Sequence, residues 1–431
     1  MSAAARRCRA LFVAAPASGQ GKTTVTAALA RRHVRQGARV RVFKAGPDFL
    51  DPLLLAAAAG SPVHNLDLWM VGEAQCRQLL AEAAREADLI LVEGVMGLYD
   101  GTPSGADLAR AFDLPVLAVI DASAMAQTFG ALVHGLATWP GHPRIAGAFA
   151  NRVGSHGHRQ MLAESLPAGI PLLGALPRDP APALPSRHLG LLPPDEIAGI
   201  EETLEALAQA IDAPPLEALP EIDFADAPVA TPTTELAGVR IAVARDAAFA
   251  FCYPANLSLL TAMGASLAFF SPLEDRRLPP CDALYLPGGY PELHLARLSA
   301  NLAMHDAIHA HHRAGRPIVA ECGGMLYLLE SLTDARGEVG ALVGLLPGRA
   351  HLQRSLANLG LQTLALPGGE LRGHSFHYST TEMNLAPAGE TRPARHHGRP
   401  EPVWHIGRLL AGYLHLYLPS NPALAAALFR P

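Results

Sequence analysis

Short apolar runs alternate with amphipathic or alanine-rich stretches over about the first 175 residues of the chain. Runs that are apolar along their whole length are typical of strands buried on both faces of a parallel sheet. One amphipathic stretch predicts a helix over residues 22–36, and Gly37 stands where a C-terminal cap is expected. The pattern predicts an α/β domain with strands at residues 10–15, 39–43, 88–92, 115–120 and 144–150.

A second alternation of the same kind covers the C-terminal half of the chain. A long helix is predicted near residues 292–313. The predicted strands lie at residues 238–244, 266–270, 282–289 and 316–322. Two separate alternations predict two α/β domains.

The segment between the two alternations has a different composition. Eleven of the 37 prolines fall between Pro177 and Pro232, a density that no continuous helix or sheet tolerates. One helix interrupts this segment, and Asp195 can cap its start. Its apolar residues recur at helical spacing at Ile197, Ile200, Leu204, Leu207 and Ile211. We therefore predict a first domain over residues 1–215, a linker over 216–237 and a second domain over 238–431.

The composition limits the class of protein. A chain of 431 residues exceeds one ordinary hydrophobic core, and 50% hydrophobic with 17% charged residues is typical of a compact soluble protein. A net charge of −5 provides no general attraction to nucleic acid or to an acidic membrane surface. No apolar stretch is long and clean enough to span a bilayer. These features predict a soluble protein that binds neither nucleic acid nor membranes.

The five cysteines form no C-x-x-C pair and no regular spacing. This argues against a structural zinc site or a disulfide framework and favours a reducing compartment. The N-terminal run LFVAAPA leads directly into a glycine loop, so we interpret it as a buried strand and not as a signal peptide. The predicted location is cytoplasmic.

The stretch PASGQGKTT, residues 16–24, follows a predicted strand and precedes a predicted helix. In this context the loop N–H groups and the positive end of the helix form a P-loop that holds nucleotide phosphates. Lys22 can reach the terminal phosphates, and the Thr23 hydroxyl can ligate Mg²⁺. The first position of the usual pattern is Pro16 instead of glycine. The predicted ATP-binding residues of the loop are Gly19, Gln20, Gly21, Lys22, Thr23 and Thr24.

Two acidic residues follow the next predicted strands: Asp48 in KAGPDFLDP and Glu93 in LVEGVMGLYDG. Because the carboxyl ends of parallel strands open at one edge of a sheet, both should lie near the P-loop. They could then hold Mg²⁺ together with Thr23. As an alternative, Asp48 or Asp51 caps a turn and Glu93 pairs with Lys44.

Asn151 follows the strand predicted at residues 144–150, in the sequence NRVG. Its side-chain amide could read a nucleotide base at the same edge of the sheet. Taken alone, the residue is equally well interpreted as a turn asparagine. We include Asn151 among the predicted ATP-binding residues.

Cys322 stands where a predicted buried strand meets Gly323 and Gly324, which open a helix. A sharp strand-to-helix turn exposes a nucleophile, and a helix N-terminus lowers the pKa of a thiol. Attack on an acyl group also needs a base and donors for the oxyanion. The predicted oxyanion and glutamine site comprises Gly288, Gly289 and Gly323, because PGGYPE ends another strand at the same edge. A small buried cysteine without a catalytic role is the alternative.

The base for this thiol has to come from elsewhere in the chain. Our candidate is His415 in GYLHLYLPSNP, which follows a short apolar segment near the C-terminus. The chain has 19 histidines, so spacing alone does not select one. His374, His377 and the pair His396–His397 are the alternatives.

Five motifs that follow the P-loop in order resemble those of the cobyrinate / hydrogenobyrinate a,c-diamide synthases of cobalamin biosynthesis. They are KAGPDFLDP, EGVMGLYDG, PGGYPE, AECGGMLYL and GYLHLYLPSNP, and the match covers almost the whole chain. The resemblance implies an N-terminal P-loop domain like dethiobiotin synthetase and a C-terminal class I glutamine amidotransferase domain with a flavodoxin-like fold. It also implies ATP, Mg²⁺, glutamine and a corrin with acetate side chains.

Carried over residue by residue, the resemblance implies that Cys322 is the nucleophile and His415 the base. It implies metal and carboxylate-activation roles for Asp48 and Glu93. In the family, the segments that contain Asp48, Leu50 and Glu93 also influence the handling of the second carboxylate.

Two positions depart from expected patterns: one from class I amidotransferases in general, whose usual glutamate the resembled family lacks, and one from the family itself. Class I amidotransferases usually have a glutamate two residues after the histidine, and this chain has Tyr417 there. Either another group orients His415 or glutamine hydrolysis is slow. In RGHSFHYS, Ser375 stands where relatives tend to have glutamate.

In such an enzyme the P-loop and the cysteine have one explanation. A carboxylate is a poor electrophile, and phosphorylation by ATP converts it to an acyl phosphate that ammonia attacks readily. Free ammonia is mostly protonated near neutral pH, so Cys322 releases it from glutamine through a thioester. The implied reaction is the amidation of the a and c acetates of hydrogenobyrinate or cobyrinate.

A corrin with several carboxylates should meet basic side chains. Besides Asp48 and Leu50, our candidate for contact with substrate is Arg152, which follows Asn151 at the sheet edge. Further candidates are Arg159, Arg178, His294 and Arg297.

Other interpretations stay open. An enzyme of the same design could act on another tetrapyrrole such as nickel-sirohydrochlorin. A ParA/MinD-like ATPase switch shares the P-loop, but it has no use for an exposed thiol or for the second domain. A degenerate amidotransferase that uses free ammonia is a third interpretation. The sequence does not separate cobalt-containing from cobalt-free substrates, and a homodimer is compatible with it.

Overall fold

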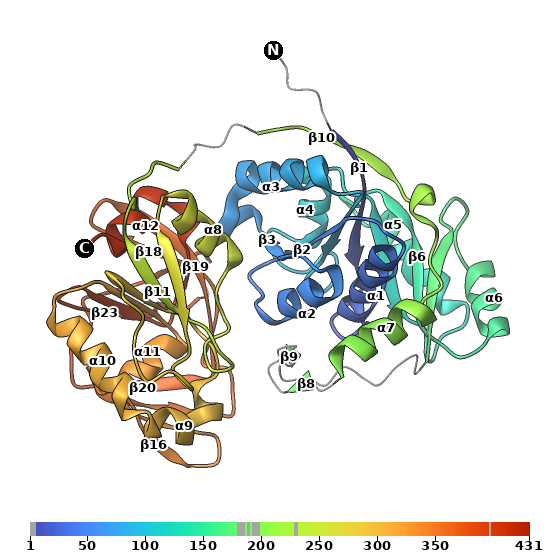
Figure 1. Cartoon of the computed structure of the whole chain (residues 1–431). Coiled ribbons are helices and arrows are strands. Elements are labelled where there is room, and N and C mark those ends of the chain that lie inside the picture. The colour runs from blue at the N-terminus through green and yellow to red at the C-terminus, as the bar shows by residue number, and fades with distance from the viewer. Residues whose placement is uncertain (1–5, 179–185, 188–189, 192–198, 228–231, 396–397) are drawn as a thin grey trace. The chain divides into compact units, whose positions relative to one another are not determined.

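The computed structural model of this chain describes residues 6–178, 186–187, 190–191, 199–227, 232–395 and 398–431 (Figure 1). The chain forms two compact units, and the division falls between Val229 and Ala230. No helix in the described ranges is both long and apolar enough to cross a bilayer.

An eight-stranded sheet, counted over the described residues, forms the centre of the first unit. In spatial order it comprises β3 (His64–Leu66), β2 (Val40–Ala45), β4 (Leu89–Glu93), β1 (Arg6–Ala14), β5 (Val116–Asp121), β6 (Ile145–Val153) and β7 (Leu172–Pro177), with β10 (Glu221–Phe224) beside β1. All neighbours are parallel except the pair of β1 and β10. The predicted parallel sheet is confirmed, and its central strands are buried on both faces, as their continuous apolar runs require.

Helices cover both faces of this sheet (Figure 1). On one face α1 packs against α2 and α7, and their apolar side chains share a core with β1, β2 and β4. On the other face α3 contacts β1 and β4, and α5 packs against α6 near β6. The helices are α1 (Lys22–Arg35), α2 (Leu50–Ala59), α3 (Glu73–Glu86), α4 (Gly105–Ala111), α5 (Thr128–Thr138), α6 (His156–Glu164) and α7 (Ile200–Ala210). Shorter elements are η1 (Leu68–Gly72), η3 (Leu216–Ala218), β8 (Ser186–Arg187) and β9 (Gly190–Leu191).

The first unit extends into the segment that the sequence predicts as a linker. Residues 216–224 form η3 and β10, and β10 pairs with β1 from Arg6–Phe224 to Arg9–Glu221. Every second residue of β10 is buried, as expected of a strand with one face on the core. The proline-rich composition of the region gave no sign of this strand. The predicted helix of this region begins after Gly199, while its predicted cap Asp195 and Ile197 lie outside the described residues.

A seven-stranded sheet, again counted over the described residues, forms the centre of the second unit. In spatial order it comprises β12 (Ser266–Phe270), β11 (Arg240–Ala244), β13 (Ala283–Leu286), β14 (Ile318–Glu321), β24 (Leu409–Gly412), β23 (Pro402–Ile406) and β21 (Gly389–Glu390). The first five are parallel, and the last two run antiparallel to their neighbours. The predicted strands of this unit are therefore present and adjacent.

Alternate residues of these strands belong to two different cores. Ile241 and Val243 pack with α8 (Pro254–Ala262) and α12 (Pro422–Phe429). Their neighbours Ala242 and Ala244 face a second core, and this core contains side chains of three helices: α9 (Leu295–Ala300), α10 (Leu302–Arg313) and α11 (Gly323–Leu328). The sheet therefore has helices on both faces.

The helix predicted near residues 292–313 is broken in the structure. It consists of the 3-10 turn η4 (Pro291–His294) followed by α9 and α10, with Asn301 between the two helices. The Asn301 side chain donates hydrogen bonds to the carbonyls of Pro272 and Asp275. This tertiary contact holds the backbone of Asn301 outside helical geometry. The spacing of apolar residues in the sequence cannot reveal such a contact.

Two four-stranded sheets of the second unit were not predicted from the sequence. One comprises β16 (Val339–Ala341), β15 (Leu329–Thr333), β17 (Leu346–Leu352) and β20 (Ser379–Met383). The other comprises β22 (Arg392–Pro393), β18 (Asn358–Leu366), β19 (Gly369–His377) and β25 (His415–Tyr417). Strand β25 is the edge strand of the second sheet and carries His415; the short η5 (Leu418–Ser420) follows it.

Candidate active sites

The P-loop connects β1 to α1. Gly19 and Gly21 have φ values of 78° and 87°, a region that favours glycine. A Cβ on Gly21 would lie 2.1 Å from Asn151 Nδ2, so this position has no room for a side chain. Residues 17–19 at the apex are exposed, and the backbone there is accessible at the positive end of a 14-residue helix.

Lys22 and Thr23 point toward the loop after β4. Lys22 Nζ donates to the Met96 carbonyl at 2.6 Å and to the Ala17 carbonyl at 3.3 Å. Burial and the nearby charge of Lys44 lower the pKa of Lys22. Thr23 Oγ1 donates to Glu93 Oε1 at 2.8 Å. The strand-end argument thus correctly places Glu93 beside the P-loop.

Lys44 is the centre of a buried acidic cluster. Its Nζ lies 2.5 Å from Asp51, 2.7 Å from Glu93 and 3.8 Å from Asp48. Burial opposes the charge of Lys44, but the three acids raise its pKa above the ordinary value. Three carboxylates around one ammonium leave an excess of negative charge that an additional cation can compensate.

The excess charge also changes the acids. Burial, followed by the charge of Asp51, raises the pKa of Asp48 to about 6, and burial raises the pKa of Glu93 to about 7. Burial also favours a higher pKa for Asp51, but the charge of Lys44 outweighs burial, and the pKa of Asp51 is lowered. Both alternatives drawn from the sequence are present here, because Glu93 pairs with Lys44 and Asp48 Oδ1 accepts a hydrogen bond from the Leu50 N–H at 2.9 Å.

These residues also fit a magnesium ion. Glu93 Oε2 is buried, with no hydrogen-bond partner among the described residues, and Thr23 Oγ1 lies beside the same carboxylate. No group of three or more His, Cys, Asp or Glu side chains arranged as a metal site occurs in the described part of the chain. Mg²⁺ does not need one, because it binds through one or two carboxylates together with phosphate oxygens and water.

Asn151 binds the backbone of the P-loop. Its Nδ2 donates to the Gln20 carbonyl at 2.9 Å, and its Oδ1 accepts from the Arg152 N–H at 3.0 Å. Gln20 Oε1 accepts from the Asp121 N–H at 2.9 Å, so the loop is tied to the ends of both β5 and β6. Asn151 thus has a structural contact that spacing alone did not reveal, and base reading stays a prediction.

The four arginines predicted to meet substrate have partners in the structure. Arg152 pairs with Asp121 at 2.7 Å, Arg159 with Asp212 at 2.6 Å, and Arg178 donates to the Ser123 carbonyl at 2.8 Å. In the second unit Arg297 lies 3.4 Å from Glu274. The Leu50 side chain is buried at the start of α2. Contact of these residues with substrate stays a prediction.

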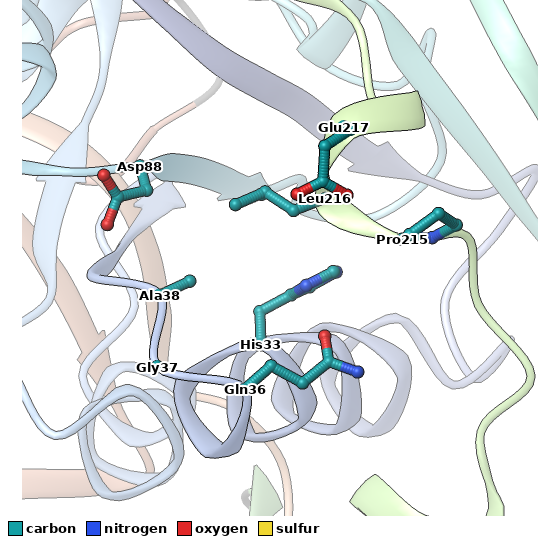
Figure 2. A pocket seen from close by; sticks show the side chains of 8 residues that line it. All are labelled: His33, Gln36, Gly37, Ala38, Asp88, Pro215, Leu216 and Glu217. Carbon is teal, nitrogen blue, oxygen red and sulfur yellow. The ribbon is translucent and has the colours of Figure 1, made fainter.

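A pocket of about 420 Å³ lies elsewhere in the first unit. Figure 2 shows its lining at the C-terminal end of α1, where His33, Gln36 and Glu217 surround it. The P-loop is at the other end of α1, roughly 20 Å away for a helix of this length. This pocket is therefore separate from the P-loop site.

Cys322 occupies a sharp turn between β14 and α11. Its φ of 42° and ψ of −106° are strained for a residue other than glycine. The backbone is held by a hydrogen bond from the Cys322 N–H to the Gly412 carbonyl at 2.7 Å and from the Leu326 N–H to the Cys322 carbonyl at 2.8 Å. This is the strand-to-helix geometry expected of a nucleophile.

The predicted glycines pack tightly around this turn. A Cβ on Gly288 would lie 2.1 Å from His415 Cε1, and a Cβ on Gly323 would lie 2.7 Å from the Gly289 nitrogen. The Gly288–Gly289 turn therefore touches both His415 and the turn of Cys322. The structure thus brings these predicted residues together although 126 residues separate Gly289 from His415 in the chain.

The other candidate bases have different surroundings. His374 is the cross-strand neighbour of His415, and burial lowers its pKa to about 4. His377 Nε2 lies 2.6 Å from Glu401, and its ring stacks on Tyr413 with centroids 3.6 Å apart. His396 and His397 lie outside the described residues. Of the described candidates, His415 is the one placed against the Gly288–Gly289 turn.

Burial changes the pKa values of both Cys322 and His415. Burial, followed by the charge of Glu292, raises the pKa of the Cys322 thiol and outweighs the Gly323 N–H at the start of the helix, which acts in the predicted direction and lowers it. Helix α11 has only six residues, and Cys322 is 6% exposed. Burial lowers the pKa of His415 to about 3. Near neutral pH the Cys322 thiol and the His415 imidazole are therefore both neutral.

Glu401 is the centre of a buried polar cluster that the sequence did not reveal. Its Oε1 accepts hydrogen bonds from Ser375 Oγ at 3.1 Å and from Asn358 Nδ2 at 2.6 Å, and it pairs with His377. Position 375 lacks the glutamate typical of the resembled family, and Glu401 brings a carboxylate to the same place. The two residues are 26 positions apart, so no local motif signals the contact.

Comparisons with known proteins follow the same two-part division. Residues 11–192 match the family described as CobQ/CobB/MinD/ParA nucleotide binding domain, and residues 240–423 match the CobB/CobQ-like glutamine amidotransferase domain. A protein of Pseudomonas aeruginosa named hydrogenobyrinate a,c-diamide synthase is 59% identical over 99% of this chain and 98% of its own length. A protein of the same name from Stutzerimonas stutzeri is 60% identical over 99% of both chains. A cobyrinate a,c-diamide synthase of Herminiimonas arsenicoxydans is 50% identical over 100% of this chain and 99% of its own.

The chain belongs to the a,c-diamide synthase family. Like the other members of this family it is a glutamine-dependent, amide-forming enzyme, and the P-loop and the Cys322 turn lie in the two matched domains. An ATPase switch of the ParA/MinD kind is excluded as the whole function, because the amidotransferase domain has no place in such a switch. The family membership confirms the resemblance drawn from the five motifs.

Proposed function

We propose that this member of the a,c-diamide synthase family amidates the a and c acetate carboxylates of hydrogenobyrinate or cobyrinate, with ATP and glutamine as co-substrates. The observation that carries the proposal is near-60% identity, over almost the whole of both chains, to two proteins named hydrogenobyrinate a,c-diamide synthase. A third relative is named for cobyrinate, so both rings belong in the test. In this proposal the protein acts in the cytoplasm, and a homodimer is compatible with it.

The first unit carries out the ATP-dependent step. Transfer of the γ-phosphoryl group of ATP to an acetate carboxylate gives an acyl phosphate and ADP. Ammonia then attacks the acyl carbon and releases phosphate, leaving the amide. Lys22 and the N–H groups of the P-loop, including those of Gly19 and Gly21, hold and neutralise the phosphates. The cycle runs twice, once for each acetate.

Magnesium belongs to this site. Thr23, Asp48 and Glu93 would hold Mg²⁺, which when bound neutralises charge on the phosphate oxygens. Two features support the proposal: the buried Glu93 Oε2 without a partner among the described residues, and the surplus of acids around Lys44. In this proposal the corrin carboxylates contact the segments that contain Asp48, Leu50 and Arg152.

The second unit supplies ammonia. The Cys322 sulfur attacks the carboxamide carbon of glutamine while His415 takes the thiol proton, and the N–H groups of Gly289 and Gly323 bind the developing oxyanion. Collapse of the tetrahedral intermediate releases ammonia, with the proton returned by His415, and leaves a glutamyl thioester. Water hydrolyses the thioester to glutamate and restores the thiol.

Mass spectrometry of corrin products tests the proposal. Hydrogenobyrinic and cobyrinic acid are each incubated with the protein, MgATP and either glutamine or ammonium. We expect two successive amidations, retained by Cys322→Ala with ammonium and lost with glutamine, and lost from both sources in Lys22→Ala.

Failure to amidate either corrin from any nitrogen source would contradict the corrin assignment. Nickel-sirohydrochlorin is then the next substrate to test. If the unmodified protein amidates the corrin with ammonium but not with glutamine, the amidotransferase domain is degenerate.

A further inference from the structure

Strand β25, which carries His415, is the edge strand of its sheet. The polar backbone groups of a buried edge strand need partners outside the ladder. For Leu416 these partners are side chains: its N–H donates to Glu321 Oε1 at 3.2 Å, and its carbonyl accepts from Asn256 Nδ2 at 2.7 Å. Asn256 Oδ1 also accepts from the Leu418 N–H at 2.8 Å. Two side chains thus fix the backbone immediately after His415.

The same side chains are joined to the turn of the nucleophile. Glu321 directly precedes Cys322 in the chain and is 2% exposed. The Tyr285 hydroxyl donates to Glu321 Oε1 at 3.0 Å and accepts from Asn256 Nδ2 at 3.1 Å. Asn256 and Tyr285 are fully buried. Glu321, Tyr285 and Asn256 therefore form one connected network between the end of β14 and strand β25.

Tyr417 leaves open which group orients His415. The usual glutamate two residues after the histidine is absent, and the Tyr417 ring packs against Tyr253 with centroids 5.7 Å apart. A carboxylate is still close to the strand, but it comes from Glu321 and binds the backbone. Its hydrogen bond to the strand is with the Leu416 N–H.

We propose that Glu321, Tyr285 and Asn256 are positioning residues that hold the strand of His415 in register with the turn of Cys322. They act through the backbone of Leu416 and Leu418, in place of a carboxylate two residues after the histidine. The inference rests on the proposed roles of Cys322 and His415 in glutamine hydrolysis.

A backbone-positioning role needs an acceptor at position 321 and not a negative charge. Burial raises the pKa of Glu321 to about 8, so the neutral acid is its main form at neutral pH. A glutamine side chain has nearly the same shape and keeps a carbonyl oxygen for the Tyr285 hydroxyl and the Leu416 N–H. Leucine has a similar volume and no acceptor.

The experiment compares glutamine-driven with ammonium-driven amidation in Glu321→Gln, Glu321→Leu and Tyr285→Phe. We expect Glu321→Leu to lower kcat with glutamine by about 10²-fold, since misplaced catalytic groups have this effect, with little change in KM. Tyr285→Phe should lower it by about tenfold. Glu321→Gln should retain most of the activity, and all three should keep the ammonium-driven rate.

Tyr327→Phe is the matched control, because Tyr327 is also buried and its hydroxyl has no partner among the described residues. It should keep both activities. Full glutamine-driven activity in Glu321→Leu, or equal losses in the Gln and Leu variants, would overturn the positioning role. If Glu321→Leu does not fold, equal activity of Tyr285→Phe and Tyr327→Phe overturns it instead. Full glutamine-driven activity of Cys322→Ala would contradict the proposed nucleophile, so the two failures are distinguishable.

Discussion

Burial decides the chemistry of single residues in both sites. Cys322 has the turn of a nucleophile, but its thiol is withdrawn from water and close to Glu292, and both raise its pKa. His415 is withdrawn in the same way, and its pKa falls to about 3 under burial and the influence of His374 and His377. The imidazole is therefore neutral near pH 7, which is the form that a general base needs in order to accept a proton.

Alkylation of Cys322 by iodoacetamide in the free protein should follow this ionisation. The thiolate is the reactive form and its pKa lies above the ordinary value of 9.0, so the rate should rise about tenfold per pH unit from pH 7 to 9. Peptide mass spectrometry measures the labelling, with Cys322→Ala as the background. A rate that levels off near pH 7 would show a thiolate already formed.

Close packing between elements places the glutamine site. The segment after β13 passes so near β25 that only glycine fits at position 288. Gly289 in turn lies close to Gly323, in the turn of Cys322. The break at Asn301 and the network at Glu321 have the same origin, since side chains from one element bind the backbone of another. Elements that look regular in the sequence are thus adjusted by tertiary contacts.

Gly288→Ala should damage the glutamine site while leaving the fold in place. A methyl group at this position would lie 2.1 Å from His415 Cε1, so the imidazole has to move. We expect glutamine-driven amidation to fall by about 10²-fold and the ammonium-driven rate to stay unchanged.

Gly389→Ala is the control, because its added Cβ meets no atom within 4 Å. Steady-state rates with the two nitrogen sources measure the effect. A Gly288→Ala variant with normal glutamine-driven activity would show that His415 does not need this position.

The whole molecule consists of two units with separate cores. The first unit has its own apolar clusters around α1 and α5, and the second has clusters on both faces of its central sheet. Each unit therefore has the means to unfold as a cooperative domain. Residues 11–192 match a nucleotide binding domain, so nucleotide bound at the proposed P-loop site should stabilise the first unit alone.

Calorimetry should show two transitions, of which MgATP raises one. At 100 times the dissociation constant a ligand stabilises its site by about 2.7 kcal/mol. For a domain of this size the shift is roughly 5–10 °C. Lys22→Ala should abolish the shift and leave the other transition unchanged. A single transition, or an equal shift of both, would contradict independent units.

Sequence alone determined the features that depend on neighbouring residues. A buried strand, a glycine loop and a helix in succession predict the P-loop, and a strand followed by Cys322 and two glycines predicts the nucleophile turn. The parallel sheets followed from continuous apolar runs. The order of five motifs identified the family, and the comparisons confirm it.

Tertiary structure decided the features that depend on residues far apart in the chain. Glu401 meets Ser375 across 26 positions, and Glu321 meets Leu416 across 95. The direction of the Cys322 pKa belongs here too, because burial depends on every element packed around the thiol. Local patterns specify which chemistry is present, while long-range contacts set the charge, the orientation and the supports of the groups that perform it.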